Sequence, residues 1–252
     1  MDIIQAKKIT RSFGREPLIT HVLRGVDVHV AEGEFLTIMG KSGAGKSTLM
    51  YQLSVLDTPS SGELVVDGVD VMQLNEKERT SFRLHTLGYV FQDYALVPDL
   101  SARENVMMPL LMRGDPWATA KRKAAKSLDE VGLAGKYENL PTELSGGEQQ
   151  RVAIARAIAV APKIIFADEP TANLDTVSSK QIIDLLTCLN ETSGQTIVMV
   201  THEREYALGA NRILHMEDGM IIREEKLRLQ KTAQPKVARF LLFILSSSLQ
   251  SI

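Results

Sequence analysis

Gly40-Lys41-Ser42-Gly43-Ala44-Gly45-Lys46-Ser47-Thr48 is the stretch that decides the fold of this 252-residue chain. Its spacing, Gly-x-x-x-x-Gly-Lys-Ser, lies between an apolar run that suits a buried strand, residues 35–39, and a helical pattern that starts after Lys46. In a phosphate-binding loop of this kind, the glycines let successive N–H groups point at the β-phosphate. Lys46 would place a positive charge between the β- and γ-phosphates, and Ser47 would offer its hydroxyl to Mg²⁺. Residues 40–48 are therefore predicted to bind a nucleotide.

Two adjacent carboxylates, Asp168 and Glu169, end a second apolar run that begins at Ile164. In phosphoryl transfer an aspartate at this place helps to hold Mg²⁺, and a second group orients the attacking water. Because side chains alternate across a strand, the two carboxylates are expected to diverge and to take different roles. Asp168 is predicted to lie on the metal side, and Glu169 is predicted to be the general base.

A further turn, Ser145-Gly146-Gly147-Glu148, stands before a helical pattern that runs over residues 149–161. Ser145 takes the N-cap position and Glu148 the N3 position of a capping box. The two glycines leave the N–H groups of the first turn bare, so that an anion could approach closely. The pattern by itself leaves two interpretations open, an anion-binding turn and a capped helix with a flexible entry.

The remaining patterns predict an α/β fold. Residues 22–30 alternate as a strand does, and strand-like runs at 163–167 and 196–200 are separated by a helical stretch around 177–190. Such alternation predicts a parallel sheet with crossover helices. We expect a P-loop NTPase core with a mixed or parallel sheet, an N-terminal antiparallel β subdomain and an inserted helical subdomain at about residues 93–145.

Two helix starts are predicted inside the helical block. Ser101 and Glu104 have the capping-box spacing ahead of an apolar helical pattern. Asp115-Pro116 is expected to open the next helix with a cap and a proline at the first helical position, and Gly132 is expected to close it.

The composition argues against several classes of protein. A formal net charge of −2 is not that of a dedicated nucleic-acid binder, so no nucleic-acid partner is expected. The single cysteine, Cys188, rules out an intramolecular disulfide and suits a reducing compartment. The longest strongly apolar stretch, residues 240–245, is far shorter than the ~20 residues that a membrane-spanning helix needs.

Together with Thr201-His202-Glu203, the three motifs occur in the order of ATP-binding-cassette ATPases, and residues 3–225 resemble that family. The sequence of residues 99–106 and 170–175 looks most like that of the macrolide-exporter and lipoprotein-release branch. The resemblance implies an ATPase domain over residues 1–228 and leaves residues 229–252 as a tail of unknown role. Packing on the domain, contact with a membrane surface and an artificial extension all stay open for the tail.

The resemblance also implies roles for single residues. Phe13 would stack on adenine, Gln92 would sense Mg²⁺ and the γ-phosphate, and Asp175 would lie at a dimer seam. Glu148 stands where glutamine is commoner in the family. The implied catalytic residues are Lys46, Glu169 and His202, the last contacting the γ-phosphate, and the implied metal ligands are Ser47, Gln92 and Asp168. The implied nucleotide-binding residues are Phe13, Gly40, Lys41, Ser42, Gly43, Ala44, Gly45, Lys46, Ser47, Thr48, Gln92, Ser145, Gly146, Gly147 and Glu148.

In that family the signature turn, residues 145–148, is useful only when it is pressed onto the nucleotide of a neighbour. We therefore expect an ATPase that uses ATP and Mg²⁺ and dimerises on binding ATP. It would drive a separate transmembrane permease from a peripheral position on the cytoplasmic face of the inner membrane. Tyr94, Leu96, Met107 and Met108 are open to two readings, contact with that permease or core of the helical block. The alternative function is a nucleotide-dependent regulator or mechanotransmission ATPase of an envelope or cell-division complex, without cargo transport.

Overall fold

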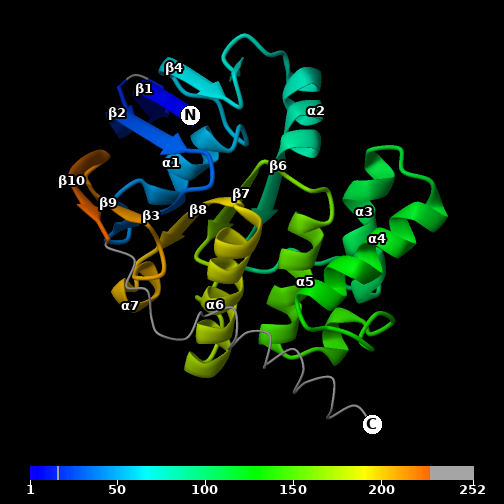
Figure 1. Cartoon of the computed structure of the whole chain (residues 1–252). Helices are drawn as coiled ribbons and strands as arrows, with labels where there is room; N and C mark the ends of the chain where they lie inside the picture. The colour runs from blue at the N-terminus through cyan, green and yellow to red at the C-terminus, as the bar shows by residue number, and fades with distance from the viewer. Residues whose placement is uncertain (16, 228–252) are drawn as a thin grey trace.

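The computed structural model describes residues 1–15 and 17–227, so the predicted tail, residues 229–252, lies outside the described residues. The described chain forms two sheets with helices packed between and against them (Figure 1). The first is antiparallel, in the order β2 (Thr20–Ala31), β1 (Asp2–Phe13), β4 (Ser61–Val66) and β5 (Val69–Asp70). Val26, Val28 and Val30 of β2 are buried, whereas the residues between them are exposed, as in a sheet with one solvated face. The predicted antiparallel β subdomain is confirmed.

The second sheet runs in the order β10 (Met220–Lys226), β9 (Arg212–Glu217), β3 (Phe35–Gly40), β8 (Thr196–Thr201), β7 (Ile164–Asp168) and β6 (Leu87–Val90). Its strands from β9 to β6 are parallel, and β10 is antiparallel to β9 at the edge. Strands β7 and β8 are buried along their whole length, which explains their uninterrupted apolar sequences. Because Met39 pairs with Thr201 and Asp168 pairs with Val200, the carboxyl ends of three strands meet at one edge.

The helices of the described residues follow the predicted alternation. They are α1 (Lys46–Leu53), α2 (Glu76–Thr86), α3 (Ala102–Met112), α4 (Trp117–Glu130), α5 (Gly146–Ile158), α6 (Thr176–Ser193) and α7 (Arg204–Ala207), with a 3₁₀ turn at Pro141–Glu143. Helix α6 is the crossover between β7 and β8. Helices α3 and α4 pack on each other and on α5, to one side of the sheets (Figure 1). Over the part of the chain that is described, no helix is long and apolar enough to cross a membrane.

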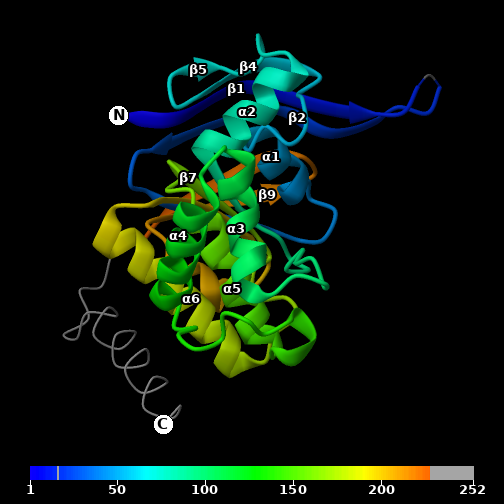
Figure 2. The same ribbon diagram turned by 90° about the vertical axis from the view of Figure 1, so that its right-hand side faces the viewer.

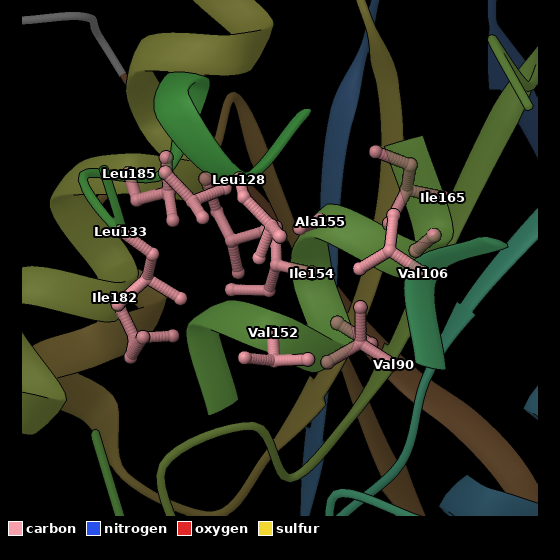
Figure 3. Close-up of a cluster of buried hydrophobic side chains, with 14 of the residues drawn as sticks. Val90, Val106, Leu128, Leu133, Val152, Ile154, Ala155, Ile165, Ile182 and Leu185 are labelled. Carbon is pink, nitrogen blue, oxygen red and sulfur yellow. The ribbon is translucent and has the colours of Figure 1, made fainter. Parts of the chain in front are cut away.

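Two large apolar cores among the described residues hold these layers together. The first lies between the two sheets and includes Leu49 and Leu53 of α1, both fully buried. The second lies on the other face of the six-stranded sheet and takes side chains from α3 to α6. Figure 3 shows Val106 of α3, Leu128 of α4 and Ile154 of α5 within this second core. The helical block and the parallel sheet thus share one core, in which α5 is the common element.

The helix starts show one confirmed prediction and one wrong one. In α3, the Ser101 hydroxyl accepts the Glu104 N–H at 3.2 Å, and the Glu104 carboxylate accepts the Ser101 N–H at 2.9 Å. The Asp115-Pro116 prediction is wrong, because α4 begins at Trp117, Pro116 occupies the N-cap position and no side chain caps the helix. The Asp115 carboxylate instead forms an ion pair with Lys123 of α4, 2.7 Å from its Nζ atom.

Candidate nucleotide-binding site

A cleft of about 1020 Å³ opens at the carboxyl edge of the parallel strands. The phosphate loop lines it with Gly40–Gly43 and Gly45–Thr48. Residues from other segments complete the lining: Val22, Met39, Gln92, Glu169, Ala172, His202 and His215. The fold therefore brings three of the predicted site residues, Gln92, Glu169 and His202, together with the loop.

The phosphate loop owes its shape to its glycines. Gly43 and Gly45 have φ values of 80° and 94°, in the left-handed region that side chains disfavour. A Cβ atom on Gly40 would lie only 2.4 Å from the Met216 carbonyl oxygen. The Lys46 ammonium folds back over the loop and donates to the Lys41 carbonyl at 3.0 Å. Because α1 begins at Lys46, its first-turn N–H groups and its positive dipole end are directed at the loop.

Ala44 departs from the expectation that the whole loop faces the nucleotide. Its side chain is buried in the first core, and Ala44 does not line the cleft. Its carbonyl oxygen accepts the Gly219 N–H at 3.1 Å. Ala44 thus anchors the loop to the turn between β9 and β10.

Asp168 is buried behind the loop, at the end of β7. Its Oδ1 atom accepts the Ser47 hydroxyl at 3.1 Å. Burial raises the pKa of the Asp168 carboxyl above its ordinary value, although hydrogen bonds from Ser47 and Tyr51 favour the ionised form. The carboxylate is therefore costly to keep charged in the nucleotide-free protein, and a nearby cation would relieve this cost.

Glu169 follows the end of β7 with a left-handed backbone, at φ 45°. Its N–H still bonds the Val200 carbonyl at 3.0 Å, while its carboxylate lines the cleft. Glu169 Oε2 lies 2.8 Å from Nδ1 of His202, which follows β8. Asp168 and Glu169 diverge as the sequence predicts, but the reason is different. The strand has already ended, so the left-handed backbone, and not strand alternation, turns Glu169 away from Asp168.

Sequence reasoning missed four residues that line the cleft, namely Val22, Met39, Ala172 and His215. Two of them, Val22 and His215, come from segments outside the predicted motifs. The pairing of β1 with β2 steps from Leu23 to His21, which leaves Val22 in a bulge. His215 pairs with Met39 in the strand beside the loop, and its neighbours Leu214 and Met216 are buried in the first core. Alternation therefore turns His215 to the cleft side. That alternation is visible in the sequence, but the strand order that places β9 beside β3 is not.

Phe13 does not line the cleft. It is the last residue of β1, pairs with Thr20 and is 45% exposed. Figure 2 shows that the β1–β2 hairpin to which it belongs extends beyond the rest of the fold. The Arg11 guanidinium lies 4.5 Å from the centroid of the Phe13 ring.

The signature turn also lies outside this cleft, since none of residues 145–148 lines it. The predicted capping box is present. Glu148 Oε2 accepts the Ser145 N–H at 2.8 Å and the Ser145 hydroxyl at 2.9 Å, and Lys136 Nζ is 3.4 Å from Glu148 Oε1. Burial opposes ionisation of Glu148, but the Ser145 hydrogen bonds and Lys136 outweigh it and lower its pKa. Both oxygens of the Glu148 carboxylate therefore already have partners, Oε2 in Ser145 and Oε1 in Lys136.

The glycines of the signature turn approach neighbouring side chains closely. A Cβ on Gly146 would lie 2.9 Å from the Tyr94 hydroxyl, and one on Gly147 would lie 3.0 Å from the Ser178 hydroxyl. Asp175, the residue implied at a dimer seam, is the N-cap of α6 and accepts the N–H groups of Val177 and Ser178, each at 2.9 Å. The starts of α5 and α6 are therefore neighbours, and both are fixed by local caps.

Fold and site together define a P-loop ATPase with a capped, glycine-bearing helix start outside its own nucleotide cleft. The family model described as ABC transporter matches residues 23–172. The chain belongs to this family of ATP-binding-cassette ATPases.

Similar proteins come from two branches of the family. The chain is 47% identical to the lipoprotein-releasing system ATP-binding protein LolD of Aquifex aeolicus, over 86% of this chain and 94% of that protein. It is 41% identical to the macrolide export ATP-binding/permease protein MacB of Aggregatibacter actinomycetemcomitans, over 92% of this chain but only 36% of MacB. The dimeric post-hydrolysis structure of the ATP-binding cassette MJ0796 bound to ADP and Pi matches with a TM-score of 0.83 at 40% identity, over 89% of this chain and 99% of that one.

Proposed function

We propose that this ATPase powers a separate membrane-spanning permease, and that two copies close around ATP, hydrolyse it and separate. One observation carries the proposal: residues 145–148 lie outside the cleft of their own chain, although the helix start that they cap is suited to an anion. Such a turn is useful when it covers the nucleotide of a second copy. The MJ0796 cassette bound to ADP and Pi is dimeric, which supports a working unit of two copies.

The names of the relatives support the proposal that this ATPase works with a membrane-spanning permease. LolD is named as the ATP-binding protein of a releasing system, and MacB joins an ATP-binding part to a permease. We propose the same division of work here, with the ATPase held peripherally at the cytoplasmic face of the inner membrane. The working unit would be residues 1–228, in which the block at residues 93–145 is a subdomain inserted in the nucleotide-binding core.

Within the closed dimer, each phosphate-handling group would have a separate task. The loop N–H groups and Lys46 bind the β- and γ-phosphates, with Lys46 exchanging the Lys41 carbonyl for phosphate oxygens. Ser145 and the bare N–H groups of Gly146 and Gly147 of the second copy bind the γ-phosphate from the other side. Glu169 accepts the proton of the attacking water, and His202 holds the Glu169 carboxylate and contacts the γ-phosphate. Phe13 stacks on the adenine base.

The donor groups around the loop fit Mg²⁺. Ser47 and Asp168 are in contact at 3.1 Å, and Gln92 lines the same cleft, so oxygen donors of the kind that Mg²⁺ takes alongside phosphates are close together. The raised pKa of Asp168 agrees with a carboxyl that is built to face a cation. Ser47, Gln92 and Asp168 would hold the ion, which supplies charge neutralisation for the phosphates.

A groove of about 270 Å³ is the proposed contact with the permease. Its lining is mainly apolar: Leu84, Leu87, Gly88, Tyr89, Phe91, Ala95, Met108, Pro109, Met112, Arg156, Ala157 and Val160. Met108 lines this groove, whereas Met107 is 1% exposed and Leu96 packs against the second core. Tyr94 donates to the Asn173 carbonyl at 3.3 Å. Of the four residues considered for docking, Met108 lines this groove, Met107 is buried, and Tyr94 and Leu96 are partly exposed outside it.

The deciding experiment uses Glu169→Gln, which should bind ATP and fail to hydrolyse it. The variant should elute as a dimer with ATP and Mg²⁺ and as a monomer without nucleotide, measured by size exclusion with light scattering. Glu205→Gln, an exposed carboxylate of α7 outside the cleft, is the matched control and should hydrolyse at the wild-type rate. Rapid hydrolysis by Glu169→Gln would contradict the base assignment.

Two further measurements test dimerisation and partner. A Ser145→Ala, Gly147→Val variant should lose hydrolysis while retaining ATP binding, because the second copy's cleft is left uncovered. Full hydrolysis by this variant as a lone chain would overturn the shared site. Capture from a detergent extract with Glu169→Gln and ATP should recover a membrane-spanning permease. A partner with a large extracytoplasmic arm and no pore would favour the regulator or mechanotransmission function.

A further inference from the structure

Arg11 and Phe13 form a stacked pair at the end of β1. The guanidinium carbon of Arg11 lies 4.5 Å from the centroid of the Phe13 ring, within the range of a cation–π contact. The two residues are two positions apart on one strand, so their side chains lie on the same face of the sheet. The cation therefore covers one face of the ring, while 45% of Phe13 stays exposed.

Asp57 fixes the position of Arg11. Nη2 of Arg11 donates to Oδ1 of Asp57 at 2.8 Å, and Nε lies 2.8 Å from Oδ2, so one hydrogen bond and a close ion pair hold the guanidinium. Both side chains are partly buried, at 23% and 30% exposure. A guanidinium held in this way loses little further freedom when a ligand stacks nearby.

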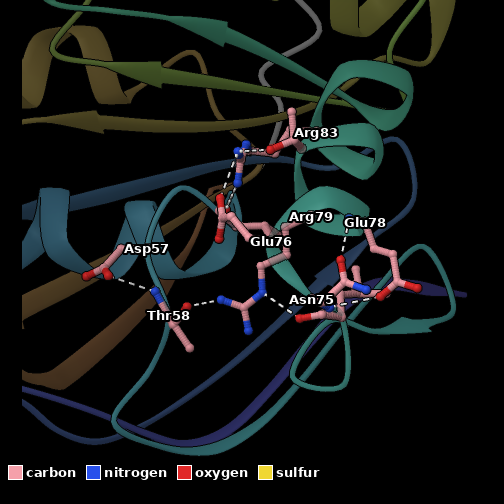
Figure 4. A network of polar contacts seen from close by, with 10 residues as sticks. Asp57, Thr58, Asn75, Glu76, Glu78, Arg79 and Arg83 are labelled. Carbon is pink, nitrogen blue, oxygen red and sulfur yellow. Dashed lines mark hydrogen bonds and ion pairs between the residues drawn. The ribbon is translucent and has the colours of Figure 1, made fainter.

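Asp57 lies in the segment after α1, the helix that follows the phosphate loop, and is bonded to the last turn of that helix. Its Oδ2 atom accepts the Gln52 amide of α1 at 2.9 Å, and its N–H bonds the Tyr51 carbonyl at 3.0 Å. Its Oδ1 atom also accepts the Thr58 N–H, and the Thr58 hydroxyl contacts Arg79 of α2 (Figure 4). The ring of Phe13 is thus connected through two side chains to the helix whose start would bind the phosphates.

We propose that Arg11 is a positioning residue for the base of the nucleotide. It holds the Phe13 ring from behind, so that adenine stacks on the open face, and Asp57 ties this platform to α1. The groups that hold the base and the groups that hold the phosphates are then bonded to each other through Asp57 and α1. The inference rests on the proposed function, in which Phe13 stacks on adenine, and it adds residues that the family motifs in this chain do not include.

The test compares a ligand with a base and a ligand without one. Dissociation constants of the full chain for MgATP and for magnesium tripolyphosphate are measured by calorimetry for Arg11→Met, Asp57→Asn and Phe13→Ala. Loss of a contact of this kind is expected to weaken MgATP binding about 3- to 10-fold in Arg11→Met. Tripolyphosphate binding should not change, and the kinetic effect should fall on KM and not on kcat. Asp57→Asn should give a smaller effect in the same direction.

Two comparisons separate positioning from general damage. Lys7→Met removes another β1 cation that is paired with a carboxylate, Glu63 at 4.0 Å, and should leave both dissociation constants unchanged. In a Phe13→Ala background, Arg11→Met should have no additional effect on ATP, because the ring on which it acts is gone.

Each other outcome is decisive. Unchanged ATP binding by Arg11→Met overturns the inference. Tighter ATP binding also overturns it, because it would mean that Arg11 covers the ring face on which the base stacks. Equal weakening of ATP and tripolyphosphate also overturns it, since a structural role would affect both ligands. If Phe13→Ala weakens ATP and Arg11→Met does not, only the inference fails. If Phe13→Ala leaves ATP binding unchanged, the base assignment in the proposed function fails with it.

Discussion

Glu169 Oε2 lies 2.8 Å from His202 Nδ1, although the two residues follow different strands, β7 and β8. The contact exists because these strands are adjacent and parallel, so their ends share one edge of the sheet. An imidazole that donates from Nδ1 to the carboxylate has its Nε2 left for another partner. Glu169 and His202 therefore act as a pair at the cleft, and removing either one should impair the same catalytic step.

We predict that Glu169→Gln lowers the rate of phosphate release by about 10²–10⁴-fold, the usual contribution of a placed general base. His202→Ala should also slow hydrolysis, because the carboxylate loses the partner that orients it. The double variant should be only as slow as the slower single variant, since groups that act together are not additive. Phosphate release at saturating ATP measures all three rates. Losses that multiply in the double variant would show that the residues act separately.

The two capping boxes with an N-cap serine, at Ser101 and Ser145, provide a matched pair of variants. Glu104→Ala in α3 and Glu148→Ala in α5 remove the same hydrogen bonds to the N-cap serine. Each should lower the free energy of unfolding by about 1 kcal/mol, measured by urea titration. Only Glu148→Ala should also slow ATP hydrolysis, because its helix start carries the signature turn. Equal effects of the two variants on hydrolysis would contradict the proposed role of the α5 start in binding the nucleotide.

Gly219 and Gly68 have the same backbone angle, φ 75°, but different surroundings. A Cβ on Gly219 would lie 2.1 Å from the Val22 carbonyl oxygen, whereas nothing lies within 4 Å of one on Gly68. Gly68→Ala should cost about 1–2 kcal/mol, the price of a left-handed side-chain residue. Gly219→Ala should cost more and should weaken ATP binding, because Val22 lines the cleft. Urea unfolding and calorimetry measure the two effects, and equal losses of stability would contradict the prediction.

Asp168 should make stability depend on pH in the nucleotide-free protein. Its pKa is raised in the folded state, mainly by burial, so the folded protein holds this proton more tightly than the unfolded chain does. The Asp168 contribution to the free energy of unfolding should therefore fall as pH rises from its ordinary pKa through the raised one, and then stay constant. Asp168→Asn should lose this dependence and be more stable at neutral pH, while losing hydrolysis.

The check is a series of urea titrations at different pH values without nucleotide or Mg²⁺. Asp99→Asn, which removes an exposed carboxylate, is the control and should keep the wild-type pH dependence. If Asp168→Asn is less stable than the wild type at neutral pH, burial is not what governs this carboxyl, and its hydrogen bonds from Ser47 and Tyr51 outweigh it.

The sequence by itself determined what depends on short spacings. The glycines and Lys46 of the phosphate loop, and the serine and glutamate of the boxes at Ser101 and Ser145, act on backbone groups within a few residues of themselves. Their chemistry could therefore be predicted before any neighbour was known. The uninterrupted apolar runs of β7 and β8 likewise predicted buried parallel strands, with Asp168 at the end of one of them.

Only the tertiary structure decided which distant residues join these motifs. Strand order put His215 beside the loop, and a bulge put Val22 into the cleft. An ion pair joined Asp115 to the Lys123 side chain of α4 in place of the helix N–H groups, and another fixed Arg11 over the ring of Phe13. The physical reason is the same in each case. These contacts join segments by packing and charge, and such pairings have no fixed spacing along the chain.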